Sequence, residues 1–229
     1  MSKKECLIIE PHSDDSCISS YGFLNKYREI YNYNFLLMFC SDVKLCHRNS
    51  IVTKQDRESE YKNYVRNLCG NYLGDIECFS PIDADTKSDS ILYSELVGMV
   101  ERAISMIKPD LMIIQGRSIH QDHENCYRAC MTALRPCGKF YPNEILVAEN
   151  PTQVHWDNTY KKLEPTTYCE LSELEIDLKI LTYKSCFPSQ ARSADNYLSN
   201  EGIKEFARYR GLESRRKYAE AFYQFSRII

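Results

Sequence analysis

The stretch Leu7–Cys17 reads LIIEPHSDDSC, an aliphatic run that passes directly into proline, histidine, serine and two adjacent aspartates. The aliphatic part is short and does not alternate with polar residues, which is typical of a strand buried on both faces of a parallel sheet. The polar part begins where that strand ends. Because open α/β sheets bind their ligands outside the carboxyl ends of their strands, this stretch predicts both a fold and a site.

Apolar runs of the same kind recur through residues 1–150, and segments with helical periodicity separate them. The expected strands are 6–10, 35–41, 76–80, 111–115 and 144–149. Alternating strands and helices predict right-handed crossovers that cover both faces of a sheet. We therefore predict an α/β fold, with a Rossmann-like, mostly parallel sheet flanked by helices on both faces and the strand order 3-2-1-4.

Three helices have recognisable faces or ends. The first spans 90–107 and precedes Pro109, which cannot continue a helix. Its apolar face is formed by Leu92, Leu96, Val100, Ile104 and Ile107. The second is expected to start at Thr53, whose hydroxyl can cap it. The third should run from Ser172 to about residue 184, because Ser172 and Glu175 have the spacing of a capping box.

The composition excludes several classes of function. The chain has 29 Lys and Arg against 32 Asp and Glu, a formal net charge of −3, so no strong field would draw it to nucleic acid. The N-terminal apolar stretch is too short for a signal peptide or a membrane span. We expect a cytoplasmic protein of one domain, residues 1–229, and leave open whether it is a homo-oligomer.

The cysteines are predicted to be reduced thiols, mostly structural. There are eleven of them, an odd number, and none has the spacing C-x-x-C. A chain of this length can bury a core without disulfide bonds. Cys126 and Cys130 are more consistent with a shared helix face than with a metal site.

Chemically active residues follow two of the predicted strands. His12 follows the first strand, and IHQDHEN, residues 119–125, follows the fourth. Strands one and four are neighbours in the order 3-2-1-4, so the two motifs should face each other at one edge of the sheet. Taken alone, Asp14 and Asp15 could merely cap a helix, and the two histidines of the second motif could be ordinary loop residues.

The meeting of the two motifs favours a metal site. An imidazole and a carboxylate from one loop and an imidazole from the other make three N/O ligands, the usual set of a catalytic zinc with an open position. Adjacent aspartates cannot easily both face one metal, so one would bind it and the other would act as general base. Zinc lowers the pKa of a bound water to about 7 and polarises a carbonyl group. Attack of that water on an amide carbonyl would produce a tetrahedral oxyanion. A second imidazole could stabilise this oxyanion or protonate the leaving amine.

The motifs PHSDD (11–15) and HQDH (120–123) resemble the signature pair of the PIG-L/LmbE-like zinc-dependent de-N-acetylases, P-H-P-D-D and H-x-D-H. Three further stretches resemble that family in the same order along the chain. They are RESEYKNYVRNLCGNYLG (57–74), ILTYKSCFPSQ (180–190) and RGLESRRKYAEAF (210–222). The resemblance implies an LmbE-like fold.

The resemblance also implies roles for individual residues. The ligands of one Zn²⁺ per chain would be His12, Asp15 and His123, the general base Asp14, and the oxyanion-stabilising partner His120. Arg57 would bind a hydroxylated or phosphorylated substrate, although a surface ion pair with Glu60 is an alternative that contributes little. Asp122 could orient a ring nitrogen or face solvent.

The implied activity is that of a metal-dependent hydrolase, a zinc-dependent N-deacetylase acting on a linear amide. Its small-molecule partner would be an N-acetylated amino sugar of the N-acetylglucosamine type or its conjugate. One alternative is a deacylase of another small amide metabolite, and a second is a metal-dependent phosphoester hydrolase, which usually needs two metals. A non-catalytic nucleotide-binding protein is disfavoured, since no G-x-G-x-x-G follows the first strand.

Residues 138–170 have no clear counterpart in the family and could line the substrate pocket. His155 and Trp156 in that segment could stack on a sugar ring, or simply pack.

Overall fold

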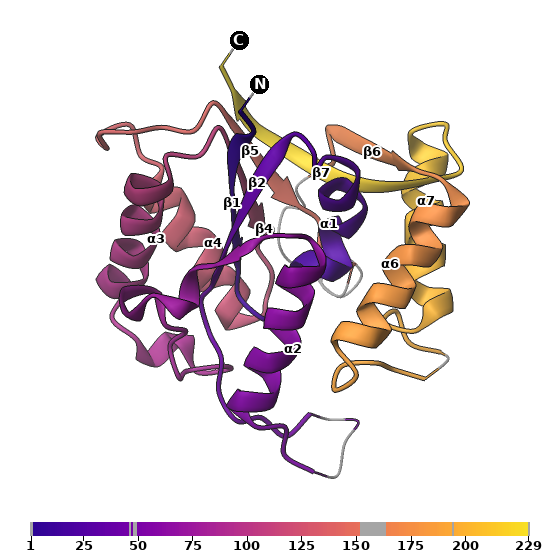
Figure 1. Ribbon diagram of the computed structural model, residues 1–229, viewed down its shortest axis with the longest axis horizontal. Coiled ribbons are helices and arrows are strands. Elements are labelled where there is room, and N and C mark those ends of the chain that lie inside the picture. Colours follow the sequence, from indigo (N-terminus) through magenta and orange to yellow (C-terminus); the bar gives the residue numbers. More distant parts are fainter. Residues whose placement is uncertain (1, 46, 48–49, 152–163, 194, 229) are drawn as a thin grey trace.

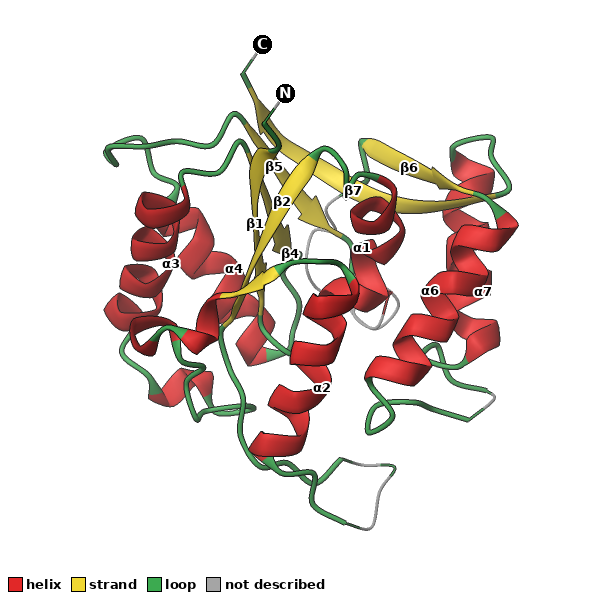
Figure 2. Ribbon diagram, viewed as in Figure 1, coloured by secondary structure: helices red, strands yellow, loops and turns green. Residues whose placement is uncertain are grey.

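The computed structural model describes residues 2–45, 47, 50–151, 164–193 and 195–228. In these ranges a seven-stranded sheet is flanked by six α-helices (Figure 1, Figure 2). The strands are β1 (Lys4–Glu10), β2 (Tyr31–Leu37), β3 (Asn71–Tyr72), β4 (Leu111–Gln115), β5 (Glu144–Ala148), β6 (Thr167–Leu171) and β7 (Tyr218–Arg227). The helices are α1 (Asp15–Lys26), α2 (Lys54–Asn67), α3 (Tyr93–Ile107), α4 (Gln121–Ala133), α6 (Glu173–Cys186) and α7 (Asn200–Glu213).

The sheet has the order β3-β2-β1-β4-β5-β7-β6. Strands β1 to β5 pair in parallel, whereas β7 is antiparallel to both β5 and β6. The predicted α/β fold and the predicted order 3-2-1-4 are therefore confirmed. The antiparallel addition of β7 and β6 comes from the part of the chain whose sequence pattern gave no topology.

The predicted strand 76–80 is wrong. Glu77–Phe79 forms a 3₁₀ turn, and the third strand of the sheet is the short β3, whose residues pair with Asn34 and Phe35. Only Phe79 of this run is buried, while Ile76 is 45% exposed. The run therefore contributes a single buried side chain to the core, whereas a central strand buries residues on both faces.

The helix ends follow the predicted signals closely. Thr53 caps α2, its hydroxyl accepting from the Asp56 N–H at 3.1 Å, and α6 starts with the predicted capping box of Ser172 and Glu175. Helix α3 starts three residues later than expected and ends at Ile107, as expected, with Lys108 as its C-cap at the left-handed φ of 51°. A residue before proline is disfavoured in the α conformation, which explains this ending.

Strand β1 is buried on both faces, as predicted. Cys6 and Ile8 belong to the core cluster that packs against α1, α2, α6 and α7, whereas Leu7 and Ile9 belong to the cluster against α3 and α4. Figure 1 shows these two groups of helices on opposite sides of the sheet. The alternation of side chains along one strand thus supplies both cores.

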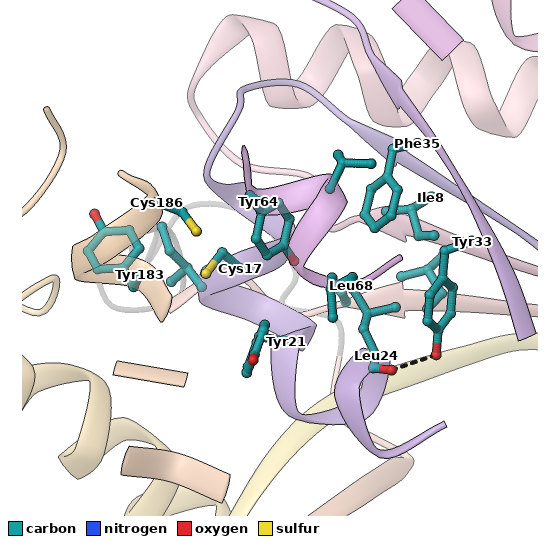
Figure 3. Packing of buried hydrophobic residues seen from close by; sticks show 14 of the residues in the cluster. Ile8, Cys17, Tyr21, Leu24, Tyr33, Phe35, Tyr64, Leu68, Tyr183 and Cys186 are labelled. Atoms are coloured by element: carbon teal, nitrogen blue, oxygen red, sulfur yellow. Dashed lines mark hydrogen bonds between the residues drawn. The ribbon is translucent and has the colours of Figure 1, made fainter. Parts of the chain in front are cut away.

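Packing of α1 against the sheet fixes the place of its N-terminal end. Cys17, Tyr21 and Leu24 extend from α1 into the first core cluster (Figure 3). The hydroxyl of Tyr33 in β2 donates to the Leu24 carbonyl at 2.7 Å, the bond drawn dashed in Figure 3. The aspartates at the start of α1 are consequently held on a rigid element.

The ten described cysteines are free thiols, and Cys126 and Cys130 are both buried on α4, as predicted. Among the described helices, none combines the length and the apolar character that crossing a membrane requires.

Candidate active site

The two polar motifs meet at the carboxyl edge of the sheet. Strands β1 and β4 are parallel neighbours, with Ile9 opposite Ile114, so the segments that follow them leave from the same edge. The first segment leads into α1, with Asp14 at the N-cap, and the second leads into α4, with His120 at the N-cap. The predicted metal ligands, His120 and Asp14 therefore come together at two helix N-termini, whereas Arg57 lies on α2.

The three predicted metal ligands lie close to one another. One ring nitrogen of each histidine, His12 and His123, and one carboxylate oxygen of Asp15 are all within 4.8 Å of one another. The Nε2 atom of His123 is 3.3 Å from Asp15 Oδ1, and the Nδ1 atom of His12 is 3.6 Å from Asp15 Oδ2. The arrangement can offer three ligand atoms to a single cation.

Asp122 holds His12 from the side opposite Asp15. It is fully buried, and its Oδ2 atom lies 2.9 Å from His12 Nε2. The carboxylate also accepts from the backbone N–H groups of Thr86 at 2.6 Å and Ser88 at 3.2 Å. The solvent-facing alternative for Asp122 is thus wrong. A carboxylate that orients a ligand histidine through its other ring nitrogen is a recurring feature of metal sites.

A second group of potential ligands, His12, His120 and Asp122, also has atoms within 4.8 Å of one another. The hydrogen bonds described above already engage both oxygens of Asp122. The group therefore fits a supporting role for Asp122 better than a separate cation site.

Asp15 is fixed by two hydrogen bonds. Its Oδ2 atom accepts from the backbone N–H of His12 at 2.8 Å, and its Oδ1 atom accepts from the side-chain amide of Asn150 at 2.7 Å. Burial opposes ionisation of Asp15, but the charges and hydrogen bonds of His123 and His12 hold its pKa below the ordinary value. Asp15 is therefore an ionised carboxylate in a fixed orientation, as a candidate oxygen ligand must be.

Asp14 has the properties of a base and not of a helix cap. Its side chain makes no capping hydrogen bond to α1, so the capping explanation fails for this residue. Burial, followed by the neighbouring charge of Asp15, raises the pKa of Asp14 to about 6. A carboxylate with a pKa in this range can take up a proton near neutral pH.

His120 is oriented by the backbone of α4. Its Nδ1 atom accepts from the N–H of Asp122 at 3.3 Å, which assigns the proton of the neutral ring to Nε2. Burial, and then the positive charges of His12 and His123, lower the pKa of His120. Its ring centroid lies 5.0 Å from that of His12. His120 is thus a neutral hydrogen-bond donor beside the candidate ligands.

Arg57 is buried, with an exposed fraction of 3%, and does not reach into solvent. Its Nη1 atom forms an ion pair with Asp85 and donates to the Ser41 carbonyl at 3.1 Å. Glu60 instead accepts from the backbone N–H and the hydroxyl of Ser189, so the alternative of a surface pair between Arg57 and Glu60 is wrong. A contact between Arg57 and substrate stays a prediction.

Two residues of the site were missed by the sequence reasoning. Asn150 follows a correctly predicted strand next to β4, so its place at the active edge could have been inferred. Asp85, whose Oδ1 atom lies 3.8 Å from His12 Nε2, follows the wrongly predicted strand 76–80, and no comparable signal marked it. His155 and Trp156 lie outside the described residues.

The charges of the described site call for a cation. Its four buried aspartates are Asp14, Asp15, Asp85 and Asp122, and its buried arginine is Arg57. Burial opposes protonation of His12, yet its hydrogen bond to Asp122 and the other nearby carboxylates raise its pKa to about 9. The site therefore attracts positive charge, and its two imidazoles and one carboxylate are ligands that zinc accepts.

No protein-family model matches the sequence, and no curated protein sequence matches it either. Solved structures do resemble the fold. A deacetylase triple mutant involved in the teicoplanin biosynthetic pathway is 16% identical with a TM-score of 0.73, and the match covers 96% of this chain and 97% of that one. The N,N'-diacetylchitobiose deacetylase from Pyrococcus horikoshii is 17% identical with a TM-score of 0.70, over 97% of this chain and 84% of that one.

The chain has the LmbE-like deacetylase fold. A third similar structure is GalB, the 4-carboxy-2-hydroxymuconate hydratase from Pseudomonas putida KT2440, at 15% identity and a TM-score of 0.70, covering 99% of this chain and 98% of that one. At these identities the likeness establishes the fold alone, and the same fold serves a hydratase as well as deacetylases. The activity has to be argued from the residues of the site.

Proposed function

We propose that this protein is a zinc-dependent N-deacetylase that removes the acetyl group from an amino sugar of the N-acetylglucosamine type or from its conjugate. The observation that carries the proposal is the convergence of His12, Asp15 and His123, with the base Asp14 beside them, at the carboxyl edge of the sheet. The similarity of the fold to deacetylases of chitobiose and of the teicoplanin pathway supports the choice of substrate class.

The zinc ion would be held by His12, Asp15 and His123, and Asp122 would keep His12 oriented. When bound, zinc supplies a Lewis acid that polarises the amide carbonyl and makes water more acidic. Asp14 accepts the proton of the attacking water, because its carboxylate is ionised at neutral pH and its pKa is raised toward that range.

His120 acts on the carbonyl oxygen of the amide, whereas Asp14 acts on the water. Its Nε2–H group donates to the carbonyl oxygen as negative charge develops there, and Nδ1 stays bound to the backbone of α4. The proton taken up by Asp14 can then pass to the leaving amine. The products are acetate and a free amino sugar.

The test is release of acetate from a panel of N-acetylated sugars by the metal-loaded protein, with the Asp14→Asn variant as a matched control. We expect acetate from at least one acetamide with the wild type and none above background with the variant. Hydrolysis of phosphoesters, or hydration of an unsaturated acid, without hydrolysis of any acetamide would contradict the proposal.

The proposal retains the other expectations from the sequence. They are a single domain over residues 1–229, a small-molecule partner and no nucleic acid, one zinc per chain, and a cytoplasmic location.

A further inference from the structure

Helix α6 has exposed leucines on its outward face. Leu174, Leu178 and Leu181 are 77%, 37% and 63% exposed, although α6 also buries Ile176 and Tyr183 in the core. The three leucines recur at positions i, i+4 and i+7, so they form one stripe along the helix. Figure 1 shows α6 on the outside of the molecule, next to α2 and α7.

Two opposite charges lie on the same stripe. Asp177 is near the start of α6, and its side chain is 56% exposed and accepts from Lys204 of α7 at 3.3 Å. Lys184 lies in the last turn, is exposed, and forms no ion pair with any described residue. We call Leu174, Asp177, Leu178, Leu181 and Lys184 the α6 stripe. The stripe is apolar in its middle, negative toward one end and positive toward the other.

We propose that the α6 stripe is the contact surface of a homodimer in which the α6 helices of two copies pack antiparallel. A twofold axis between Leu178 and Leu181 brings each Leu178 against the partner's Leu181. The same axis brings Asp177 within about one helical turn of the partner's Lys184, and the reverse pair forms by symmetry. One surface patch therefore supplies both sides of the contact.

The charge pattern selects a second copy in this orientation. In a parallel pair, the two Lys184 side chains would face each other, which is repulsive, and the two Asp177 carboxylates, each paired with Lys204 of its own chain, would gain no further opposite charge. In the antiparallel pair, both charges face their opposites, and opposite charges across an interface fix its register. The stripe is thus complementary to itself in one orientation.

The size of the stripe predicts a weak dimer. A helix of 14 residues is about 21 Å long, so a contact through one helix belongs to the small class of interfaces that bury less than ~1,200 Å² in total. The dimer should form and dissociate with protein concentration.

Sedimentation velocity of the full chain over a wide concentration range tests the proposal. We expect the wild type to shift from monomer toward dimer, and Leu181→Glu to weaken association by about tenfold or more, because a charge would be buried in the contact. The matched control is Leu212→Glu, which alters a leucine that is 60% exposed on α7, outside the stripe, and should associate like the wild type. A wild type that stays monomeric at every concentration overturns the proposal, as does association that Leu181→Glu leaves unchanged.

Charge exchange tests the orientation. Asp177→Lys alone and Lys184→Asp alone should each weaken the dimer, because each places like charges opposite one another. The double exchange should restore association to near the wild-type level, since it recreates opposite pairs in the antiparallel dimer. Failure of the double exchange to restore association overturns the antiparallel register. None of these residues belongs to the candidate active site, so the outcome is independent of the deacetylase proposal.

Discussion

Two buried groups of charge in this molecule differ in how completely they are neutralised. Glu220 of β7 accepts from Lys179 of α6 at 2.7 Å and from the backbone N–H groups of Gly22 and Phe23 at 2.8 Å each. Both side chains are buried, and their charges cancel. This group joins α1, α6 and β7, and every contact it makes is internal to the fold.

The group at the carboxyl edge is not neutralised in the same way. Four aspartates gather there around His12, and Arg57 is engaged by one of them, Asp85. A buried charge without a partner is costly, so an excess of one sign is retained where a ligand of the other sign binds. The difference between the two groups matches a structural role for the first and the proposed catalytic role for the second.

The largest expected effect removes the proposed base and leaves the three proposed metal ligands in place. Asp14→Asn should lower kcat by about 10²–10⁴-fold, because an amide cannot accept the proton of water. Zinc content should stay at the wild-type level. Acetate release and elemental analysis of the same preparation check both statements, and loss of zinc in this variant would show that Asp14 is a ligand.

The second-largest effect should come from disrupting the buried ion pair between Lys179 and Glu220. Glu220→Gln leaves the Lys179 charge buried without its partner and should lower the free energy of unfolding by about 3 kcal/mol or more. Urea unfolding measures the loss. The folded variant should still bind zinc. The double variant Lys179→Met with Glu220→Gln removes both charges, keeps an acceptor oxygen for the buried N–H groups, and should recover part of the stability; no recovery would mean that the ion pair itself is needed.

A smaller effect should come from the residue that orients a ligand. Asp122→Asn should weaken zinc affinity by about 10–100-fold, because His12 loses the carboxylate that holds its Nε2 atom. Competition with a chelator of known affinity measures the change. Glu124 lies on the same helix as Asp122 and forms a solvent-accessible ion pair with Arg117, so Glu124→Gln is a matched control that should leave the affinity unchanged.

The pH dependence gives the smallest effect. Burial and Asp15 raise the pKa of Asp14 to about 6, and only the ionised carboxylate can accept a proton. Activity should therefore fall as the pH falls through that region, about tenfold for each pH unit below the pKa. A bound cation favours the ionised form, so the fall should lie at or below pH 6 in the metal-loaded protein. A rate that is flat between pH 7 and pH 4 would remove Asp14 from the role of base.

The two buried groups of charge also differ in how far they could be predicted from the sequence. PHSDD and HQDH lie next to buried parallel strands, where a local pattern determines the position of each residue along the sheet. Asn150 has a similar position, and the same reasoning could have found it. Asp85 is placed by a loop and a 3₁₀ turn that carry no periodicity, so its contact with Arg57 depends on tertiary packing alone.

The C-terminal half was less predictable for the same physical reason. The capping box of Ser172 is local and was identified, whereas the pairing of β7 between β5 and β6 depends on contacts far apart in the chain. Glu220 and Lys179 could be recognised as partners only after that pairing was known. Local signals therefore predicted most of the candidate site, and long-range pairing determined the structure that supports it.

The central claim is that one zinc ion binds between His12, Asp15 and His123. Anomalous diffraction at the zinc edge from crystals of the zinc-loaded protein tests it most directly. We expect one strong peak per chain, about 2.0–2.2 Å from a nitrogen of each histidine and an oxygen of Asp15. A peak bound instead by His12, His120 and Asp122, or no peak at this edge of the sheet, would contradict it.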